Sequence, residues 1–253
     1  MDSRARLTLI GAGPGDVELI TVKGIRALKQ ADVVLYDDLA NQELLEYAPE
    51  GVPTYYVGKR IGKASHTQEE INAMIVAMAH EYGHVVRLKG GDSYVFGRGH
   101  EESTYAQEKG IPCQVIPGVS SCIAVPASQN IPVTRRGVSE SFWVITGTTR
   151  HGELSDDLKL AAQSKATVVV LMGLHKISEL CELYEYYGRG DLPMAVIQSG
   201  TRPDERCLLG TVSEMPQLVA ENGVGAPAIL IIGEVVTLHP NYIQEYVQSV
   251  SVS

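Results

Sequence analysis

The sequence predicts an α/β protein made of two α/β domains, and three observations support this prediction. Strand-like and helix-like segments alternate along the 253 residues. β-Branched runs at 167–171 and 229–232 are typical of strands that are buried on both faces of a sheet. One strand ends near Pro117–Gly118, where a serine-rich stretch begins, so we place the domain boundary there. The predicted parts are residues 1–117, residues 118–240 and a tail at 241–253.

The first half is expected to contain five strands and three helices. The strands are expected at 7–11, 33–38, 54–59, 84–91 and 113–118, and the helices at 21–30, 67–82 and 101–109. In the first helix, Val22, Ile25 and Leu28 are expected to form the buried face. The second helix begins with a capping box, Thr67 to Glu70. Its apolar stripe, predicted to lie in the core, is Ile71, Met74, Ile75, Met78 and Tyr82.

The second half is expected to contain five more strands and a helix. The strands are expected at 142–147, 167–173, 194–200, 206–212 and 228–236. Helical spacing of Ile177, Leu180, Cys181 and Tyr184 predicts the helix. No internal repeat relates the two halves. The tail is interpreted as a short helix, a frayed end or part of a partner contact.

Composition excludes several classes of protein. The net charge of -9 argues against a general surface for nucleic acid or anionic membrane. No apolar run approaches the roughly 20 residues of a membrane span, and the N-terminal segment lacks a signal-peptide core. The four cysteines match neither a zinc site nor a CxxC pair, so we expect reduced thiols in a cytoplasmic protein. They are Cys113, Cys122, Cys181 and Cys207.

The segment GAGPGD at 11–16 follows an apolar strand, as a dinucleotide-binding loop does. Gly11 and Gly13 match that fingerprint, but Asp16 occupies the third glycine position and would face the phosphates. Pro14 also removes one backbone N–H donor. We therefore expect close approach of a ligand without phosphate, or a tight turn that binds nothing.

The stretch from His80 to His84 spells HExxH, the motif of zinc proteases. Zinc binding requires both histidines on one face of a continuous helix. Gly83 is typical of a helix end, and His84 begins a strand, so the two imidazoles should diverge. We predict that no metal binds here.

Five loops follow predicted strands of the first half. Because ligands of open α/β sheets bind at the carboxyl edge, these loops are the candidate site. They are 11–16, the segment ending at Leu39, Gly58-Lys59-Arg60, 90–99 and 117–121.

In order, the chain carries GAGPGD, VLYDDL, GKR, RLKGGDSYVFGRG, PGVSS, IPVTRR, LMG, SGT and GAPAILIIGEVV. Together these segments, over about residues 6–237, resemble the tetrapyrrole methylase superfamily. The resemblance implies two α/β domains of that type with the active site in the trough between them, usually in a homodimer. It also implies S-adenosylmethionine as methyl donor and no metal. A sulfonium donor has no phosphate, so Pro14 and Asp16 are no obstacle.

The resemblance further implies which residues form the site. Met172 is interpreted equally well as simple packing. The cofactor-binding residues implied are Pro14, Gly90, Gly91, Asp92, Val95, Ser120, Ser121, Met172, Gly200, Pro227 and Ala228. The implied catalytic residues are Asp37 as proton acceptor, Lys59 as proton donor, and Arg98. The alternative is that Asp37 caps a loop and Lys59 binds a propionate.

The implied substrate is uroporphyrinogen III, whose carboxylates need a local basic cluster in this acidic chain. The candidates are Lys59, Arg60, Lys63, Arg87, Lys89, Arg98, Arg135, Arg136 and Arg150, of which Lys63 and Arg87 are interpreted as solvated surface charges. Arg98, Glu101 and Arg136 are the implied substrate-binding residues. Gly97 and Gly99 are expected to free the backbone so that Arg98 turns toward the substrate. The alternative is that Arg98 only ties its loop to Glu101 or Glu102.

The implied reaction is C-methylation at two adjacent rings, C-2 and C-7, to give precorrin-2 for sirohaem- or cobalamin-type synthesis. The product is expected to pass to another enzyme, because no dehydrogenase–chelatase domain precedes the motifs. Three residues depart from the family's commoner choices of proline, alanine and histidine: Ser93, Ser121 and Arg135. The alternatives are a methylase of a later corrin intermediate, the diphthamide branch and a non-catalytic binding module.

Overall fold

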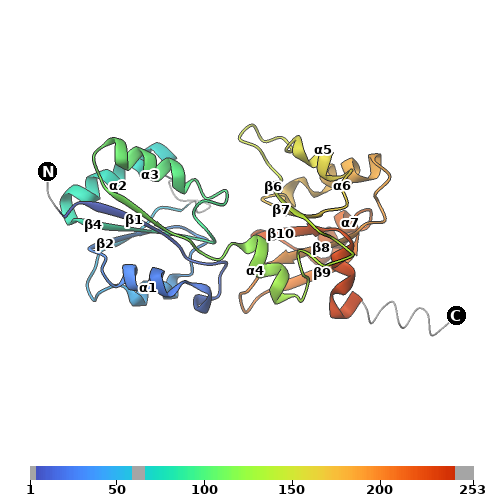
Figure 1. Ribbon diagram of the computed structural model, residues 1–253, viewed down its shortest axis with the longest axis horizontal. Coiled ribbons are helices and arrows are strands. Elements are labelled where there is room, and N and C mark those ends of the chain that lie inside the picture. The colour runs from blue at the N-terminus through green and yellow to red at the C-terminus, as the bar shows by residue number, and fades with distance from the viewer. Residues whose placement is uncertain (1–3, 59–65, 243–253) are drawn as a thin grey trace. The chain divides into compact units, whose positions relative to one another are not determined.

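The computed structural model describes residues 4–58 and 66–242. The chain divides into two compact units, Met1–Ser120 and Ser121–Ser253, called here the first and second units. Each unit is built around one five-stranded sheet (Figure 1). All ten predicted strands are therefore present, and the prediction of a two-sheet α/β chain is confirmed.

The sheet of the first unit is entirely parallel, in the order β3-β2-β4-β1-β5. Its strands are β1 Arg6–Gly11, β2 Val33–Tyr36, β3 Thr54–Tyr56, β4 His84–Lys89 and β5 Cys113–Ile116. The strand β4 is buried along its whole length. Because every strand runs the same way, the carboxyl ends of all five strands lie at one edge of the sheet.

Helices cover both faces of this sheet: α1 (Val22–Leu28) on one, α2 (Gln68–Tyr82) and α3 (Gly99–Glu108) on the other (Figure 1). Two short 3₁₀ helices, Val17–Leu19 and Gln42–Tyr47, lie in the connections. The side chains of β4 alternate between two clusters of buried apolar residues. Val85 packs with residues of α2, and Val86 packs with residues of α1.

The predictions for the two long helical segments of the first unit had different outcomes. In α2 the capping box is confirmed, and Ile71 and Ile75 are buried. In α1 the predicted face is confirmed at Leu28, which is fully buried, and at Ile25, which packs against the core, but it is wrong at Val22, which is 64% exposed. Beside these residues the helix packs through Gly24, where an added Cβ would lie 3.0 Å from Ile10 Cγ2. Such close contact with β1 centres the buried face on Gly24 and turns Val22 outward.

The second unit has a mixed sheet in the order β6-β7-β10-β8-β9, in which only β6 and β7 are parallel. Its strands are β6 Phe142–Thr146, β7 Thr167–Leu171, β8 Pro193–Gln198, β9 Arg206–Thr211 and β10 Ala228–Ile232. Its helices are α4 Ser121–Ser128, α5 Asp157–Ala161, α6 Ile177–Tyr186 and α7 Met215–Asn222. The 3₁₀ helices are Leu174–Lys176 and Glu234–Leu238.

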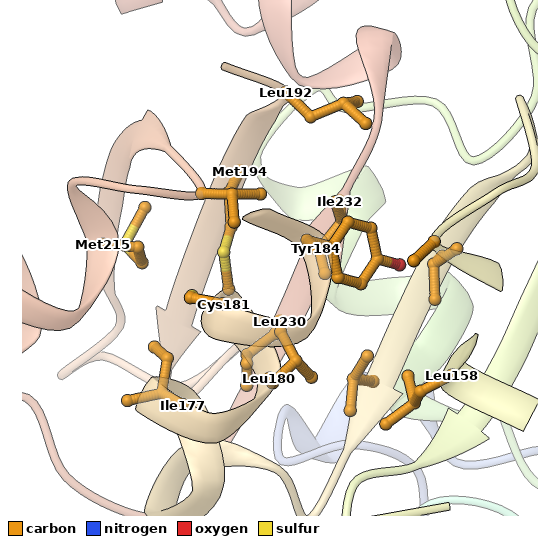
Figure 2. Packing of buried hydrophobic residues seen from close by; sticks show 14 of the residues in the cluster. Leu158, Ile177, Leu180, Cys181, Tyr184, Leu192, Met194, Met215, Leu230 and Ile232 are labelled. Carbon is orange, nitrogen blue, oxygen red and sulfur yellow. The ribbon is translucent and has the colours of Figure 1, made fainter. Parts of the chain in front are cut away.

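Figure 2 shows the main core of the second unit. The predicted helix is α6, and Leu180 and Tyr184 pack from it against Met194 and Leu230 of the sheet. The strands β7 and β10 are buried almost throughout, as their β-branched runs predicted. Helices α4, α5 and α7 were not predicted from the sequence. Across 4–58 and 66–242, no helix has the length and apolar character that crossing a membrane requires.

Candidate functional site at the strand ends

The loops after β1 and β4 lie side by side. Backbone hydrogen bonds join them, from Gly91 N to Gly13 O at 2.6 Å and from Gly13 N to Gly91 O at 3.2 Å. The chain leaves β1 toward α1 on one face of the sheet and leaves β4 toward α3 on the other. Adjacent strands with connections on opposite faces form the switch point at which open α/β sheets bind ligands. Half-buried Pro14 lies beside this junction.

The glycines of these loops pack against one another. A Cβ on Gly11 would lie 2.7 Å from Gly91 O, and a Cβ on Gly118 would lie 2.7 Å from Gly11 Cα. The close approach expected at Gly11 is therefore made by neighbouring backbone. Asp92 holds the same junction, because its Oδ2 accepts a hydrogen bond from Gly118 N at 2.9 Å and its Oδ1 accepts one from Tyr94 N at 2.8 Å.

Asp37 follows β2 and contacts the predicted cofactor loop. Its Oδ1 accepts a hydrogen bond from Gly90 N at 3.3 Å, and its Oδ2 accepts one from Arg87 Nη2 at 3.2 Å. Gly90 must be small, since a Cβ there would lie 2.9 Å from the carbonyl carbon of Leu39. The structure thus brings Asp37 and Gly90 together. Lys59, the predicted proton donor, lies outside the described residues, as do Arg60 and Lys63.

The interpretation of Arg87 as a surface charge is wrong, because its side chain is only 3% exposed. It lies between Asp37 and Glu102, whose Oε1 is 3.5 Å from Arg87 Nε and 2.9 Å from Lys89 Nζ. Burial lowers the pKa of Lys89 and the charge of Arg87 lowers it further, while Glu102 opposes the shift. The signal was in the sequence: charges in a strand buried on both faces must be paired. Gln68 Nε2 also donates to Glu102 Oε1, at 3.2 Å.

Arg98 makes a bidentate ion pair with Glu101, with Nε–Oε1 at 2.9 Å and Nη2–Oε2 at 2.6 Å. This is the tie to Glu101 that the sequence left open as the alternative. The pair raises the pKa of Arg98 and lowers that of Glu101. The expected role of the flanking glycines is wrong. Arg98 itself has a φ of 58°, whereas Gly97 and Gly99 are small because an added Cβ would lie 2.8 Å and 2.6 Å from Ser93 O.

Three apolar side chains near these loops are exposed, namely those of Leu39, Tyr94 and Phe96. Phe96 also has a positive φ of 53°, which a non-glycine residue adopts only at a cost in free energy. Val95 beside it is half-buried. Exposed apolar groups on a strained loop are typical of a surface that binds a ligand.

In the second unit, four predicted cofactor residues lie at one edge of the sheet. Met172 follows β7. The last residue of β7, Leu171, pairs with Ile229 of β10, and Pro227 and Ala228 directly precede Ile229. The carbonyl oxygen of Pro227 accepts a hydrogen bond from Ser199 N, beside Gly200, at 2.9 Å. Met172 is 50% exposed with a φ of 56°, so the interpretation as simple packing is not supported. Ser199 and Thr201 also have positive φ values, of 52° and 67°.

Three more predicted site residues are Ser120, Ser121 and Arg136. Ser121 begins α4, and Val125 on the next turn would contact an added Cβ on Gly200, at 2.9 Å to its own Cβ. Ser120 ends the first unit and is half-buried. Arg136 is exposed in a turn that the hydrogen bond from Arg135 N to Ser139 O closes.

The HExxH segment has the geometry predicted for it. His80 is exposed near the end of α2, which stops at Gly83 with a φ of 110°. His84 is buried in β4, where Nδ1 donates to Gln30 O at 2.7 Å and Nε2 accepts from Thr8 Oγ1 at 2.8 Å. Burial lowers the pKa of His84. Within the described residues no three His, Cys, Asp or Glu side chains are grouped to hold a metal ion.

Two α/β units with motif loops at their strand ends define the architecture of a tetrapyrrole methylase. The chain belongs to this family, since the family model for Tetrapyrrole (Corrin/Porphyrin) Methylases matches residues 6–216.

Curated relatives agree with this assignment. The uroporphyrinogen-III C-methyltransferase of Methanocaldococcus jannaschii is 44% identical to this chain, over 92% of the chain and 97% of the relative. The siroheme synthase of Photorhabdus laumondii is 42% identical over 94% of the chain, but this covers only 50% of the synthase. The chain thus spans about half the length of the siroheme synthases that it matches.

Solved structures confirm the predicted fold class. The uroporphyrin-III C-methyl transferase of Thermus thermophilus, complexed with S-adenyl homocysteine, aligns with a TM-score of 0.78 and 38% identity. The alignment covers 92% of this chain and 99% of that one. The cobalt precorrin-4 methyltransferase CbiF aligns with a TM-score of 0.83 and 28% identity, over 92% and 97% of the two chains.

Proposed function

We propose that this chain is an S-adenosylmethionine-dependent methyltransferase that methylates uroporphyrinogen III at C-2 and C-7 to give precorrin-2. The observation that carries the proposal is the 44% identity to a uroporphyrinogen-III C-methyltransferase over 97% of its length. The structure of a relative complexed with S-adenyl homocysteine supports the choice of methyl donor. The product would enter sirohaem- or cobalamin-type synthesis.

The described residues fit a sulfonium donor. Asp92 offers a carboxylate, a group that suits a cationic ligand, beside the small residues Gly90 and Gly91. Met172 presents an exposed apolar side chain on strained backbone. When bound, the donor supplies an electrophilic methyl group. Pro14, Val95, Ser120, Ser121, Gly200, Pro227 and Ala228 are the other proposed cofactor-binding residues.

In the proposed reaction, the residues of the chain align an electron-rich pyrrole carbon with this methyl group, with the reacting atoms about 3–3.5 Å apart. Each transfer would form a carbon–carbon bond, break the bond between the donor's sulfur and its methyl group, and release S-adenosylhomocysteine and one proton. Asp37 accepts protons from the macrocycle, and Lys59 donates a proton that the macrocycle gives up again, so one proton leaves in each transfer. Together they contribute about 10²- to 10⁴-fold to the rate. Arg98 and Arg136 bind substrate carboxylates. Glu101 contributes to substrate binding by holding Arg98 until a substrate carboxylate takes its place.

The proposal is tested by incubating the protein anaerobically with uroporphyrinogen III and methyl-labelled S-adenosylmethionine. Two labelled methyl groups should appear on each macrocycle, on adjacent rings. Calorimetry should show binding of S-adenosylmethionine and S-adenosylhomocysteine but no binding of NAD. Donor binding without transfer to any tetrapyrrole would indicate a non-catalytic binding module instead.

A methylase of a later corrin intermediate is the second candidate, and the TM-score of 0.83 with cobalt precorrin-4 methyltransferase favours it. Its lower identity, 28%, places it behind the first. Transfer to a precorrin but not to uroporphyrinogen III would reverse that order. We further propose a cytoplasmic homodimer, for which light scattering in solution should give twice the chain mass of 27.4 kDa.

A further inference from the structure

We propose that Arg87 and Glu102 are positioning residues for methyl transfer, which fix the orientation of the Asp37 carboxylate beside the cofactor loop. This inference rests on the proposed function, in which Asp37 accepts a proton. It deepens that function by giving a role to two buried side chains that the sequence did not place in the site.

The three side chains form a chain of contacts from α3 to the strand-end edge. Glu102 Oε1 lies 3.5 Å from Arg87 Nε, and Arg87 Nη2 donates to Asp37 Oδ2 at 3.2 Å. The other terminal nitrogen of Arg87 donates to Leu88 O at 2.9 Å, which fixes the plane of the guanidinium. Asp37 Oδ1 accepts from Gly90 N, so both carboxylate oxygens are held. The carboxylate is therefore oriented from the inside of the fold.

Stability alone does not explain this arrangement. The Glu102 side chain is fully buried, yet its Oε2 has no hydrogen bond within the described residues, and neither has Arg87 Nε. The Arg87–Glu102 contact is thus an ion pair without a hydrogen bond. Apolar side chains at such positions are often as stable or more stable. This series of contacts ends at Asp37, whose side chain is 23% exposed. The Asp37 carboxylate therefore reaches the surface where the predicted cofactor loop lies.

The other charged groups around Asp37 and Glu102 make contacts of their own. Lys89, on the same strand as Arg87, pairs with Glu102 at 2.9 Å and balances its charge. Asp38 adds a negative charge next to Asp37 and accepts a hydrogen bond from Tyr56 at 3.1 Å. From α2, only the uncharged Gln68 reaches Glu102. Arg87 is therefore the cation that directly contacts the Asp37 carboxylate among residues 4–58 and 66–242.

The test compares kcat and the KM for S-adenosylmethionine in Arg87→Gln, Arg87→Lys and Glu102→Gln. Arg87→Gln removes the charged donor to Asp37 Oδ2, so kcat should fall about 10-fold while the KM for S-adenosylmethionine changes much less. Arg87→Lys keeps the charge but cannot copy the planar fork of the guanidinium, so it should restore only part of kcat. Glu102→Gln weakens the hold on Arg87, so kcat should fall by less than in Arg87→Gln, again with little change in the KM.

A destabilised core provides the control. Ile75→Ala truncates a fully buried side chain of α2 and should lower the melting temperature while kcat of the folded protein stays unchanged. If Arg87→Gln leaves kcat unchanged, or lowers it no more than Ile75→Ala does, the positioning role is wrong. The carbon-13 resonance of the Asp37 carboxyl, assigned with Asp37→Asn, gives a readout without turnover. At a fixed pH it should shift in Arg87→Gln but not in Ile75→Ala, even if uroporphyrinogen III is not the substrate.

Discussion

Glu101 and Glu102 are neighbours in the first turn of α3, and each pairs with an arginine of the preceding segment. The Glu101–Arg98 pair lies in solvent, with side chains 52% and 51% exposed. The Glu102–Arg87 pair is enclosed, with side chains 0% and 3% exposed. An exposed pair contributes about 0.2–1 kcal/mol, whereas losing one partner of a buried pair costs about 3–5 kcal/mol. The direction in which a side chain leaves the helix therefore matters more than its type.

The difference in exposure between the two ion pairs suits them to different roles. Glu102 lies on the inner side of α3 with the buried residues Ser103 and Ala106, so its partners are fixed by packing. Arg98 lies at the strand-end edge, and its ion pair with Glu101 is exposed to solvent. A substrate carboxylate can replace that of Glu101 at little cost in free energy, because the two groups are chemically alike. The buried pair suits positioning, and the exposed pair suits binding.

The largest effect is expected from Glu102→Ala. It leaves Arg87 and Lys89 buried without their common carboxylate, so the free energy of unfolding should fall by about 3–5 kcal/mol. Urea denaturation measures this loss directly. Glu101→Ala is the matched control one residue away and should cost no more than about 1 kcal/mol. Equal losses in the two variants would contradict the comparison.

Arg98→Ala is expected to reduce methyl transfer while leaving cofactor binding normal. Losing a charge-assisted bond to a substrate carboxylate costs about 1.5–3 kcal/mol, or roughly 10- to 150-fold in rate. Arg98→Lys should recover little of the lost rate, because the ammonium of lysine cannot make the bidentate contact of a guanidinium. Single-turnover rates and donor titration measure the two properties separately.

Asp92→Ala should show the reverse pattern, with weakened donor binding, because Asp92 holds the loops of Gly118 and Tyr94 together. If Arg98→Ala instead lowers the melting temperature and weakens both ligands, the Glu101 pair is only a tie within its loop. Unchanged turnover in Arg98→Ala would exclude the substrate role.

Periodic features could be predicted from the sequence because neighbours along the chain decide them. The capping box of Thr67 and the stripe through Ile71 and Ile75 need only helical spacing, and both are confirmed. Val22 failed because contact between α1 and β1 depends on Gly24, whose closeness to another element no single period reveals. Tertiary packing overrides local pattern at such places.

The candidate site could be predicted only in part. The sequence predicted that the loops after β2 and β4 share one edge of the sheet, and the hydrogen bond from Gly90 N to Asp37 Oδ1 agrees with this. Arg87 was misassigned because charge alone predicts exposure, although its strand is buried on both faces. The glycines on either side of Arg98 were explained by backbone freedom, but their reason is contact with Ser93, which only the folded loop shows.

Ser93 offers a smaller change on the buried side of the comparison. It is fully buried, and its Oγ has no hydrogen-bond partner among the described residues. A buried polar group without a partner costs about 1–3 kcal/mol. Ser93→Ala should therefore raise the free energy of unfolding by about 1 kcal/mol, part of the gain being lost to the small cavity. A fall in the melting temperature would show that the hydroxyl has a partner after all, such as an ordered water.

The smallest effect is expected from Glu101→Gln, and it depends on pH. Arg98 lowers the folded-state pKa of Glu101, so the pair adds stability above the ordinary glutamate pKa of about 4.3 and loses it as pH falls through the lower folded value. Because both side chains are about half exposed, solvent limits the contribution to about 0.2–1 kcal/mol. At pH 7 and low salt, Glu101→Gln should reduce the free energy of unfolding by that amount. The difference from the unaltered protein should shrink in high salt and should be lost as the pH falls below the folded-state pKa of Glu101, as denaturation at a series of pH values would measure. A difference that persists at low pH would mean that Glu101 stabilises the loop by packing, and the contrast with Glu102 would then rest on burial alone.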